Sequence, residues 1–186
     1  MGKCLSSISR MLLKTFGWEV TVTIPDYPKS IICVAPHTSN WDFILGELAY
    51  TSVGRKAGFL MKDTWFFFPL GAMFRALGGI PVPRRKGSKF SLVEYLTEKY
   101  RTSEVLNLAI TPEGTRSLTT QWHSGFLRIA HEAGVPIILG AIDGEHRRVI
   151  LERTFTTTGD IEADMRAIKD YYRPFSGIRP GKFSAE

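Results

Sequence analysis

The residues best suited to proton transfer are His37 and Asp42, which lie five positions apart in residues 37–42, HTSNWD. This segment follows the apolar run 31–35, which is typical of a strand buried on both faces. A turn after the strand can bring the carboxylate back to the imidazole, where it fixes the tautomer of the ring and stabilises the imidazolium. A histidine held in this way can act as a general base on a hydroxyl or an amine. The spacing alone also fits a capping aspartate next to a structural histidine.

A second charged segment, residues 112–117 with the sequence PEGTRS, follows another apolar run at 105–110. The planar guanidinium of Arg116 suits a phosphate or a carboxylate, and Glu113 could orient that arginine or a substrate hydroxyl. Gly114 permits a close approach of the backbone. Taken alone, the segment also fits a surface turn with an ion pair. In open α/β sheets, ligands bind outside the carboxyl ends of the strands, so we predict that the two segments converge on one pocket.

The sequence marks no covalent nucleophile next to these segments. It has no Gly-x-Ser-x-Gly elbow, and Cys33 lies inside an apolar run, where we expect a small core residue. Its four histidines lack metal-ligand spacing such as His-Glu-x-x-His. A direct transfer, in which the base activates the acceptor itself, fits this pattern better than a covalent acyl-enzyme. We expect no metal and no resident cofactor.

The bulk composition predicts one globular domain. A length of 186 residues and contents of 44% hydrophobic and 23% charged residues are ordinary for such a domain. The net charge of +6 fits a membrane surface, a nucleic acid or a phosphorylated substrate, and equally a general solubility charge. Nucleic acid is not expected, because the chain lacks zinc-finger spacing and an RNA-binding aromatic signature. Two cysteines fit a reducing compartment, and we identify no membrane-spanning run and no signal peptide.

Strands that alternate with helices predict an α/β fold, with a largely parallel or mixed central sheet flanked by helices. We assign residues 1–18 to an amphipathic N-terminal helix and residues 19–186 to the main domain. The expected strands are 20–24, 31–35, 58–62, 80–83, 105–110, 136–141 and 149–151. The expected helices are 4–17, 41–51, 66–77, 88–100, 125–132 and 161–172.

For two apolar segments, the sequence is compatible with either a place in the core or a place in a membrane interface. The helix at 4–17 has apolar residues at helical spacing, with Arg10 and Lys14 elsewhere on its surface. It either packs on the core or lies in a membrane interface. The aromatic run 65–68, WFFF, is either core or a second interfacial contact.

Two further segments complete the set of motifs. Residues 78–86, GGIPVPRRK, place three cations after a strand, which suits a phosphate and equally a solvated basic loop. Residues 135–140, VPIILG, read by themselves as a buried strand.

Together and in this order, the four segments resemble the glycerolipid acyltransferase family, whose type member is 1-acylglycerol-3-phosphate acyltransferase. That family shows His-x-x-x-x-Asp, Gly-x-Ile-Pro-Val-x-Arg, Pro-Glu-Gly-Thr-Arg-Ser and Val-Pro-Ile blocks. The resemblance covers about residues 30–142, with spacings like those of short bacterial members. It identifies residues 19–186 as an acyltransferase domain.

The resemblance implies transfer of a fatty acyl group from acyl-CoA or acyl carrier protein to a hydroxyl of 1-acylglycerol-3-phosphate or a related lysolipid. His37 is then the general base and Asp42 its partner, without a covalent intermediate. A thiolate is a good leaving group, so attack by an activated hydroxyl needs little more than positioning and oxyanion stabilisation. The residues implied in acceptor binding are Arg84, at the phosphate, and Glu113, Gly114, Thr115 and Arg116.

The resemblance also implies a location and partners. It predicts a cytoplasmic protein that is peripheral on the cytoplasmic face of the membrane and meets a lysophospholipid there. Two positions depart from the family pattern: Pro83 stands where an Asp is common, and His123 where a Lys is frequent. The missing lysine leaves open an acceptor without phosphate, such as an aminoacyl lysolipid. A thioesterase and an inactive lipid-binding protein are further alternatives.

Overall fold

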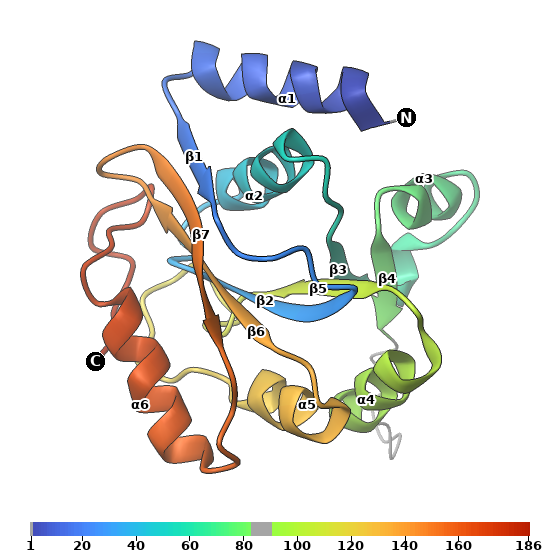
Figure 1. Ribbon diagram of the computed structural model, residues 1–186, viewed down its shortest axis with the longest axis vertical. Coiled ribbons are helices and arrows are strands. Elements are labelled where there is room, and N and C mark those ends of the chain that lie inside the picture. Colours follow the sequence, from blue (N-terminus) through green and yellow to red (C-terminus); the bar gives the residue numbers. More distant parts are fainter. Residues whose placement is uncertain (1, 83–90) are drawn as a thin grey trace.

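A seven-stranded sheet forms the centre of the computed structural model, which describes residues 2–82 and 91–186 (Figure 1). The strand order across the sheet is β1-β7-β6-β2-β5-β3-β4. Neighbouring strands run parallel except β6 and β7, which pair antiparallel. The strands are β1 (Glu19–Val22), β2 (Lys29–Ala35), β3 (Gly58–Lys62), β4 (Gly79–Val82), β5 (Leu106–Ile110), β6 (Ile137–Asp143) and β7 (Arg148–Phe155).

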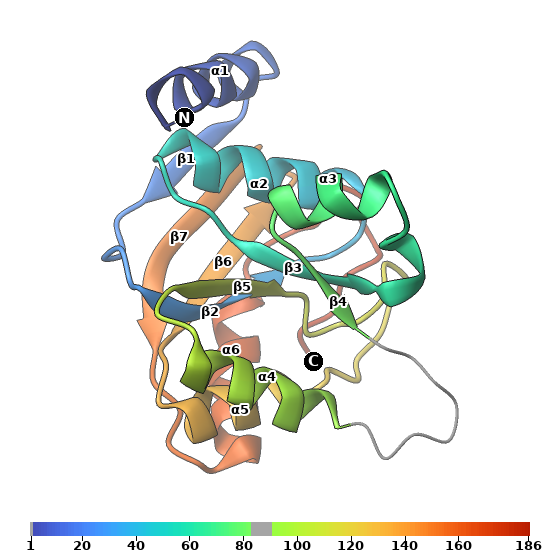
Figure 2. The ribbon, with the colours of Figure 1, turned by 90° about the vertical axis from the view of Figure 1, so that its right-hand side faces the viewer.

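Helices cover both faces of the sheet (Figures 1 and 2). One face carries α2 (Trp41–Ser52) and α3 (Leu70–Ala76), with α1 (Gly2–Thr15) lying on α2. The opposite face carries α4 (Leu92–Thr102), α5 (Gly125–Ala133) and α6 (Ile161–Tyr172). The predicted fold class, an α/β domain with a mixed, mostly parallel sheet between helices, is confirmed.

The central strand β2 is buried on both faces, because helices lie above and below it. Its residues alternate between two cores. Ile31 and Cys33 belong to the cluster under α4, α5 and α6, whereas Ile32 belongs to the cluster under α1 and α2. The chain that leaves the carboxyl end of β2 is therefore anchored on both sides before it reaches His37.

The structure corrects the bounds of several expected elements; the strand expected over 149–151, for example, spans Arg148–Phe155. The helix predicted over 66–77 covers only Leu70–Ala76, and residues 63–65 form a separate 3-10 turn. Pro69 precedes the helix, where its missing amide hydrogen costs nothing. The strand predicted from Val105 begins one residue later, and Val105 itself is 70% exposed.

α4 begins at Leu92, later than the helix expected from residue 88, and residues 88–90 lie outside the described residues. Ser91 is the N-cap, and its hydroxyl accepts a hydrogen bond from the amide of Glu94. α5 ends at Ala133, one residue after the expected end, and Gly134 adopts the left-handed conformation that closes a helix.

α1 packs on the domain through a narrow face of small residues. Ser6, Ser9 and Leu13 are buried, whereas the apolar side chains of Leu5, Ile8 and Met11 are exposed. The apolar arc of this amphipathic helix therefore faces outward. Within the described residues, no helix combines the length and the hydrophobicity needed to cross a bilayer.

Candidate active site

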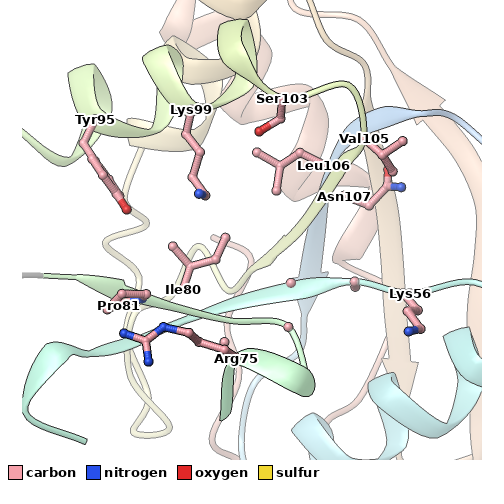
Figure 3. A pocket seen from close by; sticks show the side chains of 14 residues that line it. Lys56, Arg75, Ile80, Pro81, Tyr95, Lys99, Ser103, Val105, Leu106 and Asn107 are labelled. Carbon is pink, nitrogen blue, oxygen red and sulfur yellow. The ribbon is translucent and has the colours of Figure 1, made fainter. Parts of the chain in front are cut away.

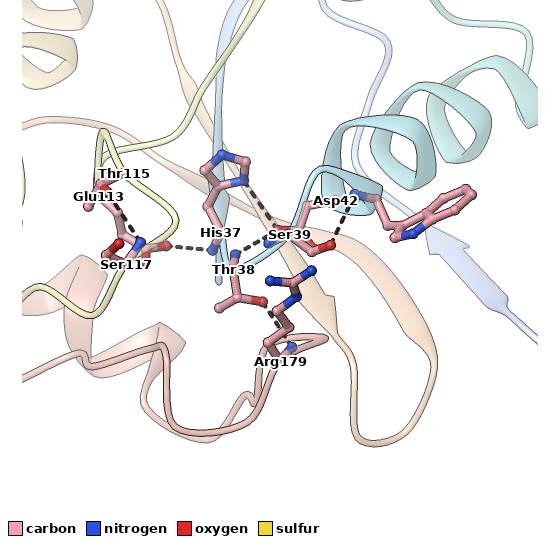
Figure 4. Close-up of polar contacts among 9 residues, drawn as sticks. His37, Thr38, Ser39, Asp42, Glu113, Thr115, Ser117 and Arg179 are labelled. Atoms are coloured by element: carbon pink, nitrogen blue, oxygen red, sulfur yellow. Dashed lines mark hydrogen bonds and ion pairs between the residues drawn. The ribbon is translucent and has the colours of Figure 1, made fainter.

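The neighbouring strands β2 and β5 bring the two charged segments together. They pair in parallel, with Cys33 opposite Ile110, so both carboxyl ends reach the same edge of the sheet. The backbone amide of His37 donates a hydrogen bond of 2.6 Å to Oε1 of Glu113, across 76 residues of sequence (Figure 4). The two segments therefore lie side by side at this edge, whereas a pocket shared by them stays a prediction.

The Asp42 carboxylate lies in the first turn of α2 and folds back onto the loop before the helix. Its Oδ2 accepts hydrogen bonds from the amides of Thr38 at 2.6 Å and Ser39 at 2.7 Å. The same oxygen lies 3.2 Å from Nδ1 of His37. Asp42 is only 2% exposed, and the two amides and the imidazole all lie at Oδ2, whereas among the described residues its buried Oδ1 has no hydrogen-bond partner. The carboxylate is thereby fixed at the position that stabilises a protonated His37.

The ring of His37 presents its other nitrogen outward. Nδ1 is buried, the side chain as a whole is 19% exposed, and Figure 4 shows Nε2 pointing away from Asp42. Within the described residues, no hydrogen bond engages Nε2. Nε2 can therefore take a proton from a molecule that binds at this edge, while Asp42 supports the imidazolium from the opposite side of the ring.

Glu113 lies beneath the His37 loop. It is 2% exposed; its Oε1 accepts from the His37 amide, and among the described residues its Oε2 has no hydrogen-bond partner. The pKa of Glu113 is raised to about 7, mainly because the carboxyl is buried; the hydrogen bond from the His37 amide opposes this rise, and the nearby Asp42 charge adds to it. Arg116 is exposed, and no ion pair joins it to Glu113 in the described part of the chain.

The turn after Glu113 depends on a glycine. Gly114 has a φ of 63°, and a Cβ there would lie 2.6 Å from Cδ2 of His123. Only glycine combines this backbone conformation with such a close approach of the ring. Thr115 stabilises the turn, because its Oγ1 accepts from the amide of Ser117 at 3.2 Å. Arg84, the remaining residue implied in acceptor binding, lies outside the described residues.

Two contacts at this edge come from residues that the sequence analysis did not single out. Oγ1 of Thr38 accepts a hydrogen bond of 3.1 Å from the amide of Arg179, 141 residues away. A Cβ on Gly177 would lie 2.3 Å from Cγ2 of Thr38, so the C-terminal segment touches the His37 loop directly. No local sequence pattern marks these residues, because their contact depends on the path of the chain after α6.

Cys33 does not take part in chemistry at this edge. It is fully buried, and burial raises the pKa of its thiol to about 12, so the thiol stays protonated at neutral pH. In the part of the chain that the structure describes, no cluster of three or more histidine, cysteine or acidic side chains is arranged to hold a metal ion.

A cavity of about 570 Å³ lies at the other edge of the sheet, where β3, β4 and β5 begin (Figure 3). Its lining includes Lys56, Arg75 and Lys99, from three different elements, and no acidic side chain. His37 and Glu113 are not part of it. The cavity and the His37 site are therefore separate.

Comparison with known proteins gives a consistent result. A family model described as Acyltransferase matches residues 19–142, which include both charged segments. The fold is similar to the crystal structure of the 1-acyl-sn-glycerophosphate (LPA) acyltransferase PlsC from Thermotoga maritima. The TM-score is 0.60 at 17% sequence identity, over 92% of this chain and 76% of that chain. No curated protein sequence matches the chain.

Proposed function

The chain belongs to the acyltransferase family, and we propose that it moves a fatty acyl group from a thioester to the hydroxyl of a lysolipid. The donor is acyl-CoA or acyl carrier protein, and the acceptor is 1-acylglycerol-3-phosphate or a close relative. The observation that carries this proposal is the buried Asp42 carboxylate 3.2 Å from Nδ1 of His37, with Nε2 left accessible. The proposal is also supported by the likeness of the fold to PlsC, which is described as an LPA acyltransferase.

The reaction needs one base and no covalent intermediate. Nε2 of His37 accepts the proton of the acceptor hydroxyl while the hydroxyl oxygen attacks the thioester carbonyl. The new C–O bond forms, and a tetrahedral oxyanion carries the developing charge. The C–S bond then breaks, and the imidazolium returns its proton to the leaving thiolate. Asp42 stabilises the imidazolium between these two proton transfers.

The remaining residues of the two segments have distinct roles in this proposal. Glu113 fixes the backbone of His37 from below. Gly114 and Thr115 shape the turn that brings Arg116 to the same edge, where its guanidinium suits the acceptor phosphate. Arg84 is assigned to the same phosphate, and a direct contact of Glu113 with the acceptor stays a prediction.

The acceptor is a lipid, and α1 supplies a surface suited to a membrane. Its apolar arc, Leu5, Ile8 and Met11, is exposed, and Met11 reaches 61% exposure. Arg10 and Lys14 are also exposed on this helix, which favours the anionic surface of a bilayer. We therefore propose a peripheral protein on the cytoplasmic face of the membrane, with α1 lying in the interface.

Thiol release from palmitoyl-CoA tests the reaction. Purified protein is assayed with 1-acylglycerol-3-phosphate, with 1-acylglycerol and with no acceptor, and the lipid products are identified. We expect release that requires the phosphorylated acceptor and yields phosphatidic acid. Equal release without acceptor would show that the protein is a thioesterase instead. A preference for 1-acylglycerol would show that the acceptor carries no phosphate. Absence of release with CoA and acyl carrier protein donors alike would contradict the proposed function.

Flotation with vesicles tests the surface on α1. Wild-type protein is expected to bind vesicles that contain anionic phospholipid, and Met11→Asp in the apolar arc is expected to weaken that binding. Val105→Asp is the matched control, since it places the same charge at an exposed apolar residue far from α1. Equal loss of binding in both variants would contradict an interface centred on α1.

A further inference from the structure

The segment 176–179, which follows α6, packs against the loop that carries His37. It lies outside the residues that the family model matches. Its Arg179 amide donates to Oγ1 of Thr38 at 3.1 Å, and Thr38 is almost completely buried. The segment thus contacts the residue next to the proposed general base.

Two glycines make this contact tight. A Cβ on Gly177 would overlap the side chain of Thr38, and a Cβ on Gly144 would lie 2.5 Å from the Cα of Ile178. The Gly144 amide also donates to the carbonyl of Ser176 at 2.7 Å. The backbone of the segment is therefore held between the His37 loop and the turn after β6, so the position of Arg179 is fixed by backbone contacts.

The side chain of Arg179 is a cation that forms no ion pair with the residues that the structure describes. It is exposed, and within the described residues no carboxylate lies within ion-pair distance of it. Figure 4 shows it extending from the C-terminal segment toward the loop that carries Ser39 and Asp42. Asp42 is already engaged by two amides and lies beside His37. Within the described residues, no carboxylate therefore pairs with the guanidinium, which leaves it available to an anion at this edge of the sheet.

We propose that Arg179 forms an anion subsite that binds a phosphate group of a substrate beside His37. The planar guanidinium suits phosphate, with which it forms paired, charge-assisted hydrogen bonds. The inference rests on the proposed function, in which the acceptor 1-acylglycerol-3-phosphate and the donor acyl-CoA both carry phosphate. Arg179 is a binding residue in this view, and proton transfer stays with His37.

The substitution Arg179→Ala tests the subsite without breaking the contact to Thr38, because the backbone amide remains. kcat and KM are measured for both substrates and for a phosphate-free counterpart of each, 1-acylglycerol and an acyl-N-acetylcysteamine thioester. We expect KM of one phosphate-bearing substrate to rise about 10- to 100-fold, with kcat within about threefold. KM of its phosphate-free counterpart is expected to stay unchanged, and the affected substrate identifies the source of the phosphate.

Two variants serve as controls. Arg179→Lys keeps the charge but loses the planar fork, and it is expected to recover part of the affinity. Arg173→Ala removes the same charge from an exposed residue that pairs with Asp170, and it is expected to leave both KM values unchanged. An equal rise of KM in Arg173→Ala would show a general charge effect and overturn the subsite. Unchanged KM values in Arg179→Ala, or a fall in kcat alone, would also overturn it.

Calorimetry separates failure of this inference from failure of the proposed function. If wild-type protein transfers no acyl group, the proposed function fails, and binding of glycerol 3-phosphate and of CoA still tests Arg179. Binding to the wild type that weakens at least tenfold in Arg179→Ala supports the subsite. Equal binding to both proteins, or no binding to either, overturns it.

Discussion

The two edges of the sheet differ in whether their charged side chains are buried and hydrogen-bonded or exposed. At the carboxyl edge, Asp42 and Glu113 are buried, and backbone amides of residues 37–39 donate to both carboxylates. At the amino edge, the described residues that line the cavity of about 570 Å³ include three cations and no acidic side chain, among mostly apolar and neutral residues. Its cations Lys56 and Arg75 are exposed to solvent. The cavity offers room, whereas the carboxyl edge offers fixed charges.

This difference favours the carboxyl edge as the site of the proposed acyl transfer. Burying a carboxylate costs free energy unless hydrogen bonds and nearby positive charge compensate it. Such an arrangement holds groups in a defined geometry, which is what proton transfer requires. The cations of the cavity form no ion pair among the described residues, and Arg75 lies over the ring of Phe66 at 5.2 Å from its centroid. Cavity volume alone would therefore have pointed to the wrong edge for the acyl transfer that we propose.

The largest effect is expected at the carboxyl edge, from His37→Ala. Removal of the proposed general base should lower kcat by about 10³-fold, because water must then accept the proton of the hydroxyl. The measurement is thiol release with the lipid acceptor, and circular dichroism and thermal unfolding check the fold. A folded variant with full activity would remove His37 from the mechanism.

Asp42→Asn tests the support of the imidazolium. The amide oxygen can still accept from the amides of Thr38 and Ser39, but the negative charge beside Nδ1 is lost. We expect kcat to fall by about 10²-fold, with KM little changed. A change confined to KM would instead assign Asp42 to substrate binding.

Glu113→Gln tests how the buried carboxylate of Glu113 changes the free energy of unfolding with pH. The pKa of Glu113 rises from 4.5 to about 7 in the folded protein, so the folded state holds this proton more tightly than the unfolded state. Its contribution to stability is fully present below pH 4.5 and is lost as the pH rises through about 7. The free energy of unfolding of the wild type should fall, relative to Glu113→Gln, by an amount on the order of 2 kcal/mol over this range.

Urea unfolding at several pH values measures this difference. Glu47 also has a pKa raised to about 7 by burial, so the wild type alone would show a combined effect. The comparison with Glu113→Gln cancels the contribution of Glu47, which both proteins share. A difference between the two proteins that does not vary with pH would contradict the raised pKa of Glu113.

The smallest effect is expected at the amino edge. Replacing Arg75 and Lys99 with alanine removes two cations of the cavity, and neither forms an ion pair in the described part of the chain. We expect a change in unfolding free energy within about 0.5 kcal/mol and kcat and KM within about twofold of the wild type. A large loss of activity would place the cavity in the path of a substrate and break the contrast between the two edges.

The sequence by itself determined the local geometry. Continuous apolar runs located the strands before the two charged segments, and a serine and a glycine in the sequence mark the start of α4 and the end of α5. The five-residue spacing of His37 and Asp42 allowed their approach, because one turn separates them, but it fitted a capping aspartate beside a structural histidine equally well. These features depend on neighbours in the chain, whose relative positions follow from backbone geometry.

Only the tertiary structure decided the contacts between distant segments. Pairing of β2 with β5 placed Glu113 beneath His37, and the path of the chain after α6 placed Arg179 beside Thr38. The outward orientation of the apolar arc of α1 was likewise settled by packing of Ser6 and Ser9 against the domain. Such contacts depend on strand order and on how helices pack. Because no local pattern of residue types encodes that arrangement, the fold had to be known before the carboxylate beneath the base and the cation beside it could be identified.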